Sequence, residues 1–324
     1  MTSKDQTRIA VASRSFSKHP ILRAELLERF ANVTFNDAGV SLKGEELVAF
    51  LRGHERAITA LERLDEAVLA ALPELRAISK YGVGLDMLDL DAMARRGVLL
   101  GWTGGVNKRS VAELVLAAAI NLLHGAAVGT AEVKGGKWRQ VPGRQLTGKT
   151  VGIIGCGHIG KEVVRVMASF ACTILANDPI DYADFYAESG VRPVSLEMLL
   201  RESDVVTLHT PLDATTRNLL SRERLVAMKQ GAVLINMARG GLVDESALRE
   251  QLLEGRLAGA AFDVFEAEPP SDGALLALPN FLPTPHIGGS SDEAILAMGR
   301  AAIEGLSAAR HVSEYGELQR IRRT

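Results

Sequence analysis

Three polar side chains in the second half of the chain are of the types needed for acid–base chemistry on a small anionic substrate. Arg239 follows the apolar run AVLINMA, Glu268 lies shortly after FDVF, and His286 lies in LPTPHIGG. An Arg can bind a carboxylate through two hydrogen bonds and polarise a neighbouring carbonyl. A His exchanges protons near neutral pH, and a carboxylate can orient it and stabilise its protonated form. Reduction of a 2-keto acid by hydride transfer needs this set, although each residue taken alone could be an ordinary surface or loop residue.

A glycine-rich turn near the middle of the chain indicates the source of the hydride. In GIIGCGHIGKE, Gly155, Gly157 and Gly160 have the spacing G-x-G-x-x-G, between a predicted strand and a predicted helix. The first glycine permits a tight turn, the second lets the backbone approach a pyrophosphate, and the third lets helix and strand pack closely. The helix N-terminus adds free N–H groups. The turn, which also contains His158 and Ile159, is therefore predicted to bind a dinucleotide.

The second strand of this unit ends in an acidic residue that bears on the choice of dinucleotide. Asp178 ends the run CTILAND, 18 residues after Gly160. An acid about 20 residues downstream of the glycines binds the ribose 2′-hydroxyl, and its charge disfavours a 2′-phosphate. The sequence therefore predicts NAD as the cofactor, in preference to NADP. The alternative is that Asp178, which precedes Pro179, is only a turn residue.

The elements that would position these residues alternate regularly along the second half of the chain. After a loop rich in glycine and basic residues, apolar strands separated by helices are predicted at 150–155, 172–178, 204–210, 232–238, 257–265 and 281–287. This alternation predicts a parallel sheet covered on both faces, and six such strands suit a doubly wound dinucleotide-binding domain. Ligands of such sheets bind at the carboxyl ends of the strands, where Arg239, Glu268 and His286 all lie.

The first hundred residues predict a smaller unit of the same kind. Strands are expected at 8–13, 57–61 and 75–79, and helices at 19–30 and 64–72. Two such units suit a chain of 324 residues, at about 150 residues per domain.

One long apolar segment, at 111–129, raises the question of a membrane span. It contains Glu113, Asn121 and His124, which are costly in lipid. It is therefore predicted to be one buried helix, apolar nearly all round, that needs cover on more than one side.

Bulk composition argues against several classes of function. The net charge is −2, which gives no basic face for nucleic acid. The two cysteines, Cys156 and Cys172, are too few for a disulfide framework or a zinc site, and they are predicted to be small buried side chains in a reducing compartment. The N-terminal residues contain no long apolar signal segment. We therefore expect a cytoplasmic protein with no metal, no nucleic-acid partner and no membrane association.

Seven motifs, which extend from 78 to 294, give the sequence a specific resemblance. They are ISKYGVGLDMLDL, TGGVNKRSVAELVLA, LTGKTVGIIGCGHIG, DVVTLHTPLDATTRNLLS, LINMARGGLVDESAL, AAFDVFEAEPP and TPHIGGSSDEA. With them the chain resembles the D-isomer-specific 2-hydroxyacid dehydrogenases, of the phosphoglycerate dehydrogenase-like kind. The resemblance implies an α/β fold of two domains. One is a Rossmann doubly wound parallel sheet at 102–287 that binds NAD, and the other is a smaller flavodoxin-like α/β substrate-binding domain made of 1–101 and 288–324.

The resemblance also implies a role for each site residue. Arg239, Glu268 and His286 match the catalytic positions. The positions that match the substrate site are Tyr81, Gly82, Val83, Gly84, Arg239 and His286, with backbone N–H groups of the glycine loop holding the substrate carboxylate. The positions that match the cofactor site are Gly155, Gly157, His158, Ile159, Gly160, Asp178, His209, Thr210, Pro211, Ala238, Arg239, Asp263, His286 and Gly288. Within that set, Asp263 matches the acid that contacts the nicotinamide carboxamide.

The resemblance bears on assembly and on substrate as well. It implies a homodimer formed through the cofactor domain. Because the chain ends soon after His286, it also implies a short form without the C-terminal regulatory domain. The expected substrate is a small 2-hydroxy or 2-keto acid of the hydroxypyruvate, glyoxylate or 3-phosphoglycerate type. Lys80 and Arg63 are candidate cations for a substrate phosphate, and each could instead be a solvated surface charge.

The sequence departs from the family pattern at a few positions. Met87 stands where relatives have Asn, Gly104 stands where they have Pro, and a polar Asn177 precedes Asp178. Glu268 stands where formate-oxidising relatives have Gln, which argues against that activity. Two alternatives to a 2-hydroxyacid dehydrogenase stay open. One is an NAD(H)-sensing, corepressor-like binding protein, and the other is a phosphite or phosphoerythronate dehydrogenase on the same scaffold.

Overall fold

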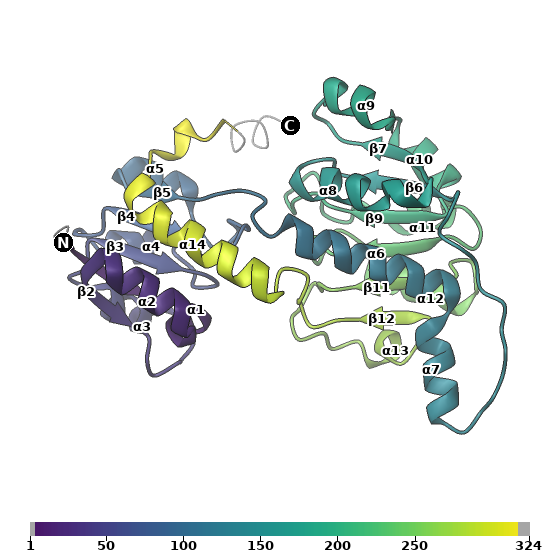
Figure 1. The fold of residues 1–324 in the computed structure, drawn as a ribbon, viewed down its shortest axis with the longest axis horizontal. Helices are drawn as coiled ribbons and strands as arrows, with labels where there is room; N and C mark the ends of the chain where they lie inside the picture. The colour runs from purple at the N-terminus through teal and green to yellow at the C-terminus, as the bar shows by residue number, and fades with distance from the viewer. Residues whose placement is uncertain (1–3, 317–324) are drawn as a thin grey trace. The chain divides into compact units, whose positions relative to one another are not determined.

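The computed structural model describes residues 4–316, which form two compact α/β units. One unit comprises Met1–Asn107 together with Asp292–Thr324, and the other comprises Lys108–Ser291 (Figure 1). Each unit is built around one sheet in which every strand pair is parallel. The predicted α/β class with parallel sheets is confirmed.

The sheet of the smaller unit has five strands in the order β2-β1-β3-β4-β5, which is the flavodoxin-like order. Its strands are β1 (Asp5–Val11), β2 (Phe30–Phe35), β3 (Arg56–Thr59), β4 (Ala77–Lys80) and β5 (Leu99–Gly101). Its helices are α1 (Arg14–Lys18), α2 (Pro20–Arg29), α3 (Gly44–Leu51), α4 (Glu66–Ala70), α5 (Leu90–Arg96) and α14 (Asp292–Ala308), followed by the 3₁₀ turn η2 (Val312–Glu314). The three predicted strands correspond to β1, β3 and β4. The prediction missed β2, in which only Phe30 is buried, and β5, which has only three residues.

Helix α14 brings the C-terminal part of the chain onto this sheet, where it packs against β3, β4 and β5 (Figure 1). The hydroxyl of Ser79 donates to the carbonyl of Ala302, at 2.6 Å. A Cβ added to Gly101 would lie 2.3 Å from the carbonyl oxygen of Gly305, so the helix and β5 approach as closely as their backbones allow. Residues from both ends of the chain therefore share one core.

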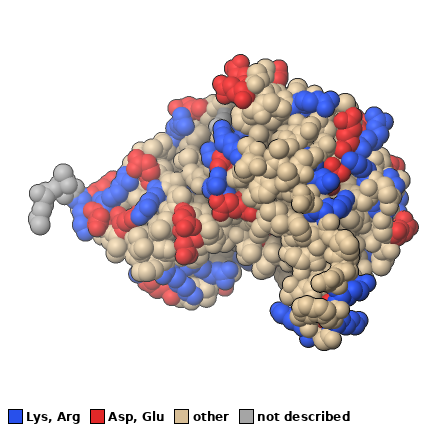
Figure 2. Space-filling model, turned by 45° about the vertical axis from the view of Figure 1, so that its right-hand side comes forward, with Lys and Arg blue, Asp and Glu red and all other residues tan. Residues whose placement is uncertain are grey.

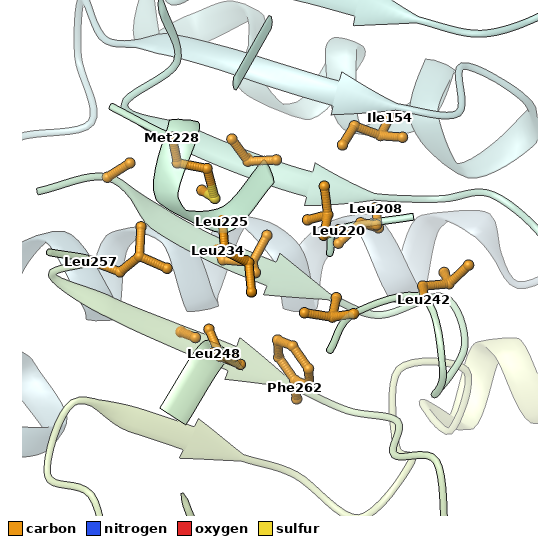
Figure 3. Packing of buried hydrophobic residues seen from close by; sticks show 14 of the residues in the cluster. Ile154, Leu208, Leu220, Leu225, Met228, Leu234, Leu242, Leu248, Leu257 and Phe262 are labelled. Atoms are coloured by element: carbon orange, nitrogen blue, oxygen red, sulfur yellow. The ribbon is translucent and has the colours of Figure 1, made fainter. Parts of the chain in front are cut away.

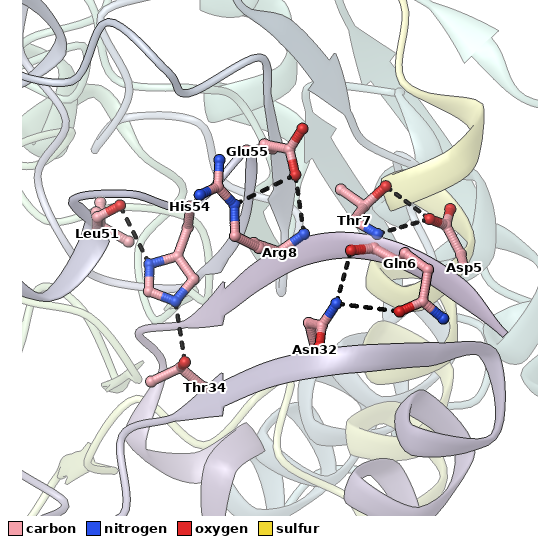
Figure 4. Close-up of polar contacts among 9 residues, drawn as sticks. All are labelled: Asp5, Gln6, Thr7, Arg8, Asn32, Thr34, Leu51, His54 and Glu55. Atoms are coloured by element: carbon pink, nitrogen blue, oxygen red, sulfur yellow. Dashed lines mark hydrogen bonds and ion pairs between the residues drawn. The ribbon is translucent and has the colours of Figure 1, made fainter.

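Polar side chains form hydrogen bonds between neighbouring strands of the same sheet (Figure 4). The backbone N–H of Arg8 donates to the carboxylate of Glu55 at 3.1 Å, and the Asn32 side chain donates to the carbonyl of Gln6 at 2.8 Å. These bonds connect β1 to β2 and to the turn before β3.

The larger unit has a seven-stranded sheet in the order β12-β11-β10-β9-β6-β7-β8. Its strands are β6 (Thr150–Ile154), β7 (Thr173–Asn177), β8 (Arg192–Pro193), β9 (Val205–Leu208), β10 (Val233–Asn236), β11 (Gly259–Phe262) and β12 (Phe281–Pro283). Its helices are α6 (Lys108–His124), α7 (Ala126–Lys134), α8 (His158–Met167), the 3₁₀ turn η1 (Ala168–Phe170), α9 (Ala183–Ser189), α10 (Leu196–Glu202), α11 (Arg222–Ala227), α12 (Glu245–Leu253) and α13 (Gly273–Leu276). All six predicted strands are present. The seventh, β8, has two exposed residues and no apolar run to reveal it.

Side chains on the central strands of this sheet alternate between two apolar clusters, one on each face. Along β10, Val233 and Ile235 belong to the cluster that also contains residues of α6 and α8, whereas Leu234 belongs to the other. Figure 3 shows this second cluster, in which Leu234 and Phe262 from the strands meet Leu225 and Leu248 from α11 and α12. Burial on both faces explains why these strands read as continuous apolar runs.

The prediction of a single helix over 111–129 is wrong, because the segment is divided between two helices. α6 ends at His124, Gly125 has a left-handed backbone (φ +67°), and α7 then runs at 65° to α6. Glycine adopts this conformation at no steric cost, so it turns the chain where another residue would continue the helix. In the described part of the chain no single helix meets the length and hydropathy required of a membrane span, and only this bent pair meets them when its two helices are taken together.

Candidate active site

The glycine turn lies between β6 and α8 and has the geometry of a phosphate-binding turn. Gly155 has φ +91°, and an added Cβ would lie 2.6 Å from the carbonyl of His209. A Cβ on Gly160 would lie 2.3 Å from the carbonyl oxygen of Gly155. A Cβ on Gly157 would meet nothing within 4 Å. Close packing thus requires glycine at Gly155 and Gly160. Gly157 instead leaves open space at the N-terminus of α8, which begins with His158 and Ile159. This turn fits the pyrophosphate of a dinucleotide.

Asp178 lies beside this turn, just after β7. One of its carboxylate oxygens accepts the backbone N–H of Cys156 at 2.7 Å, and the other accepts the N–H of Ile180 at 2.8 Å. Burial raises the pKa of the carboxyl group, and the two hydrogen bonds together with the charge of Lys161 oppose that rise. The side chain is therefore held in one position against the turn, where it fits the predicted contact to a ribose.

The neighbouring Asn177 points elsewhere, because its side-chain amide donates to the carbonyl of Val194 at 2.9 Å.

The residues that follow β9 pack against the glycine turn. The backbone N–H of His209 donates to the carbonyl of Ile154 at 2.7 Å, and its imidazole Nε2 lies 2.9 Å from the hydroxyl of Thr207. The ring is buried, and this burial lowers the pKa of His209 to about 3. The imidazole is therefore neutral at physiological pH. Thr210 is half-buried and Pro211 is exposed directly after it.

Arg239 is positioned by a buried amide at the end of β10. The side chain of Asn236 accepts the N–H of Ala238 at 3.1 Å and donates to the carbonyl of Arg239 at 2.8 Å. The guanidinium of Arg239 donates to the carbonyl of Ala238 at 2.6 Å. The turn after β10 is thus closed by Asn236, a residue that sequence reasoning did not select.

Gly240 has an equally specific role in bringing two segments of the site together. An added Cβ would lie 1.9 Å from the carbonyl group of Phe265, so only glycine lets the segment after β10 approach the segment that leads to Glu268. The glycine pair after Arg239 was the signal that could have revealed this contact.

His286 and Glu268 form a hydrogen-bonded pair near the ends of β12 and β11. Imidazole Nδ1 lies 2.9 Å from Glu268 Oε2, and the two side chains are 50% and 41% exposed. The other carboxylate oxygen of Glu268 accepts the N–H of Phe265 at 3.2 Å, which fixes the orientation of the carboxylate. With Nδ1 directed at Glu268, Nε2 is the nitrogen that faces away from it.

Asp263 holds the loop that carries His286. Its carboxylate is 2% exposed and accepts three hydrogen bonds: from the hydroxyl of Thr284 at 2.6 Å, from the N–H of Ile287 at 2.8 Å and from the N–H of Gly288 at 2.7 Å. His286 itself has φ +54°, a conformation that costs a non-glycine residue about 1–3 kcal/mol. The contacts of Asp263 fix this strained loop, a role that the sequence did not reveal.

The predicted substrate loop belongs to the smaller unit and follows β4. Gly82 has φ +127°, and residues Gly82, Val83 and Gly84 are half-buried. The Tyr81 ring, by contrast, is buried edge-on against Phe16 with ring centres 5.4 Å apart, and burial raises the pKa of its hydroxyl.

The two cations proposed for a substrate phosphate have protein partners. Lys80 is buried, and its ammonium group donates to the carbonyl of Ala60. Arg63 is largely exposed, and its guanidinium lies 3.8 Å from the carboxylate of Asp65.

These observations first define a class: an α/β protein whose larger unit has the doubly wound sheet and the glycine turn of a dinucleotide-binding domain. Residues 116–288 match the family model described as D-isomer specific 2-hydroxyacid dehydrogenase, NAD binding domain. The chain is 35% identical over 284 residues to a D-3-phosphoglycerate dehydrogenase of Methanocaldococcus jannaschii, covering 86% of this chain and 54% of that protein. It is 38% identical over 242 residues to a hydroxypyruvate reductase of Thermotoga maritima, covering 73% of this chain and 78% of that protein.

Solved structures agree with these relatives. The D-lactate dehydrogenase of Aquifex aeolicus, solved in complex with NAD and lactic acid, superposes with a TM-score of 0.81 at 26% identity, covering 98% of both chains. The chain therefore belongs to the D-isomer specific 2-hydroxyacid dehydrogenase family, and the cofactor of its dinucleotide-binding domain is NAD. The chain spans about half the length of the curated phosphoglycerate dehydrogenases that it matches.

Proposed function

We propose that this protein is an NAD-dependent dehydrogenase that transfers a hydride between nicotinamide and a small D-2-hydroxy acid or its 2-keto acid. The observation that carries the proposal is the pair formed by His286 and Glu268, with 2.9 Å between imidazole and carboxylate. An imidazole oriented in this way can give a proton to a carbonyl oxygen and take it back from a hydroxyl. Family membership supports the same reaction class.

Each residue has a separate part in the proposed reaction. Bound NADH would supply the hydride. His286 would hold the exchanging proton on Nε2, because Nδ1 is engaged by Glu268, whose negative charge stabilises the imidazolium. Arg239 would bind the substrate carboxylate and polarise the carbonyl. Backbone N–H groups of the loop Gly82–Gly84 would bind a substrate carboxylate.

Among the expected substrates, we favour unphosphorylated keto acids such as hydroxypyruvate and glyoxylate. The reason is that Lys80 is buried with its ammonium group on the carbonyl of Ala60, and that Arg63 is a 76% exposed surface side chain with a 3.8 Å contact to Asp65. The name of the Thermotoga relative agrees with this choice, and the names of the phosphoglycerate dehydrogenases do not.

The test is oxidation of NADH by the purified protein with glyoxylate, hydroxypyruvate, 3-phosphohydroxypyruvate, pyruvate and a longer keto acid, each repeated with NADPH. We expect turnover with NADH and one of the small unphosphorylated acids. Preference for 3-phosphohydroxypyruvate would contradict the substrate proposal alone. NADH binding without turnover of any of these acids would contradict the proposed substrate class and reaction, and would favour either the NAD(H)-sensing alternative or a phosphite or phosphoerythronate dehydrogenase.

We further propose that the protein forms a homodimer through its NAD-binding unit. Helix α7 contains no buried residue, and the apolar side chains of Val133 and Val141, at its end and in the segment after it, are 53% and 60% exposed. On the face shown in Figure 2, acidic and basic side chains are intermixed over most of the surface, so no large patch of one charge marks another interface there. A monomeric mass in light scattering would contradict the proposal, and a dimer that Val141→Glu dissociates would support it.

The domain roles and the cellular location follow as proposals too. The larger unit, Lys108–Ser291, would bind NAD, and the smaller unit, Met1–Asn107 with Asp292–Thr324, would bind the substrate; these bounds lie six and four residues from the expected 102 and 288. We also propose a cytoplasmic location without nucleic-acid or membrane partners, supported by the small net charge and by the two free cysteines, of which Cys156 is buried and Cys172 half-buried. Cell fractionation tests the location directly.

A further inference from the structure

The indole of Trp102 contacts the backbone of the proposed substrate loop. Its Nε1–H donates to the carbonyl oxygen of Val83, at 3.0 Å. Trp102 directly follows β5 and Val83 lies three residues after β4, the neighbouring strand of the same sheet. The contact therefore connects the ends of two paired strands within the smaller unit.

This hydrogen bond determines where a neighbouring N–H points. The carbonyl of Val83 and the N–H of Gly84 belong to one planar trans peptide group, so they point in opposite directions. When the carbonyl is directed at Trp102, the N–H of Gly84 is directed away from it. Glycines on both sides of Val83 would otherwise let this peptide group rotate at little steric cost, and Gly82 already has φ +127°.

We propose that Trp102 is a positioning residue that locks the peptide group between Val83 and Gly84, so that the N–H of Gly84 is held ready for the substrate carboxylate. This inference rests on the proposed function, in which the loop binds that carboxylate. It adds a residue that neither the glycine loop nor the three catalytic residues contain.

Trp102 is itself held by the C-terminal part of the chain. Its ring packs edge-on against the buried ring of Tyr315, with centres 5.8 Å apart, and its backbone N–H donates to the Tyr315 hydroxyl at 3.3 Å. That hydroxyl donates in turn to the carbonyl of Leu100. The guanidinium of Arg310 lies 4.4 Å from the centre of the Tyr315 ring, and its backbone pairs with Leu100 through bonds of 2.9 and 3.1 Å. The segment after α14 thus fixes the indole, and the indole fixes the loop.

The surroundings of Trp102 make a conservative test variant feasible. Trp102 borders a cavity of about 330 Å³, lined also by Thr103, Glu304, Gly305, Ala308, Arg310 and Tyr315, so a smaller ring enlarges an existing cavity and does not open a new one. Trp102→Phe keeps an aromatic ring that can contact Tyr315 and removes the N–H donor together with part of the ring volume. Trp138, the only other tryptophan, is 84% exposed, so Trp138→Phe is the matched control.

The experiment compares wild type, Trp102→Phe and Trp138→Phe in keto-acid reduction and in calorimetric binding of oxamate, a keto-acid analogue, to the NADH complex. For Trp102→Phe we expect KM and the oxamate Kd to rise about three- to tenfold, the loss of one hydrogen bond, with the NADH Kd unchanged. Trp138→Phe should match wild type. A kcat that falls at constant KM, or oxamate affinity equal in all three proteins, would overturn the inference.

Two further readings keep this test decisive. If wild type binds oxamate but turns over no keto acid, the proposed function fails and the comparison of oxamate affinities still decides the role of Trp102. If wild type turns over a keto acid but does not bind oxamate, the proposed function stands, and the KM of Trp102→Phe decides the role of Trp102. Should Trp102→Phe be unstable, Tyr315→Phe gives a second variant, and faster amide exchange in the peptide that contains Val83 and Gly84 is expected for it. Unchanged exchange would count against the inference.

Discussion

Replacing Asp263 by Asn tests whether a buried carboxylate holds the loop of His286. The carboxylate accepts hydrogen bonds from Thr284, Ile287 and Gly288 through both of its oxygens. Asn has the same shape but only one acceptor oxygen. In either orientation its NH₂ group faces a backbone N–H, of Ile287 or of Gly288, and leaves that donor buried without a partner.

The cost can be estimated from that lost acceptor. A buried donor left unpaired costs about 1–3 kcal/mol. The backbone of His286 is already strained at φ +54°. Rearrangement of the loop would relieve this strain once the hydrogen bond to residue 263 is lost. If that energy is paid whenever His286 is brought into its working position, kcat falls about five- to 150-fold.

The assay is steady-state reduction of the preferred keto acid, with the NADH Kd measured separately by fluorescence. We expect a fall in kcat with a nearly constant NADH Kd. Thr284→Val is the matched control, because it removes the hydroxyl donor and leaves both N–H groups paired, so its kcat should fall less than about tenfold. An Asp263→Asn protein with kcat within about twofold of wild type would refute the reasoning. An unchanged kcat with a much weaker NADH Kd would instead assign Asp263 to the nicotinamide, as the family resemblance implies.

Three further predictions concern the turn, the catalytic pair and the buried histidine. Gly157→Ala should leave the Tm of the cofactor-free protein unchanged and weaken NADH binding by about tenfold or more. Gly160→Ala should lower the Tm itself, because the added Cβ on Gly160, unlike that on Gly157, would clash with the carbonyl oxygen of Gly155. Thermal scans with and without NADH separate the two effects. Glu268→Gln should slow keto-acid reduction about ten- to hundredfold by removing the charge 2.9 Å from His286, and His286→Ala about 10²- to 10⁴-fold; either variant at wild-type rate would contradict the assigned roles. His209 has a pKa of about 3 when folded and about 6.5 when unfolded, so its contribution to stability is present above pH 6.5 and is lost as the pH falls toward 3. In urea unfolding between pH 6 and 4, His209→Gln should therefore reduce proton uptake on unfolding by about one, and an unchanged slope would show that the imidazole is not buried neutral.

The α/β alternation and the glycine turn could be predicted because both depend on residues that are close together in the sequence. Strands buried on two faces, such as β10, must be apolar along their whole length, and close helix packing at Gly160 excludes any other side chain. The failures have local causes as well. A glycine inside an apolar segment is compatible with a continuous helix, and only the backbone at Gly125 shows that the chain turns there. A two-residue strand such as β8 has no periodicity to detect.

The sequence by itself determined the class of fold, the dinucleotide turn and the identity of the polar residues at the strand ends, because each depends on residue type and short spacing. Only the tertiary structure decided how those residues are held. Asp263 reaches Gly288 across 25 positions, and Trp102 reaches Val83 across 19. The close approach of Gly240 to Phe265 likewise joins the ends of two strands. Such contacts arise where parallel strands bring their carboxyl ends to one edge of a sheet, and no local pattern in the chain records which of those ends will meet.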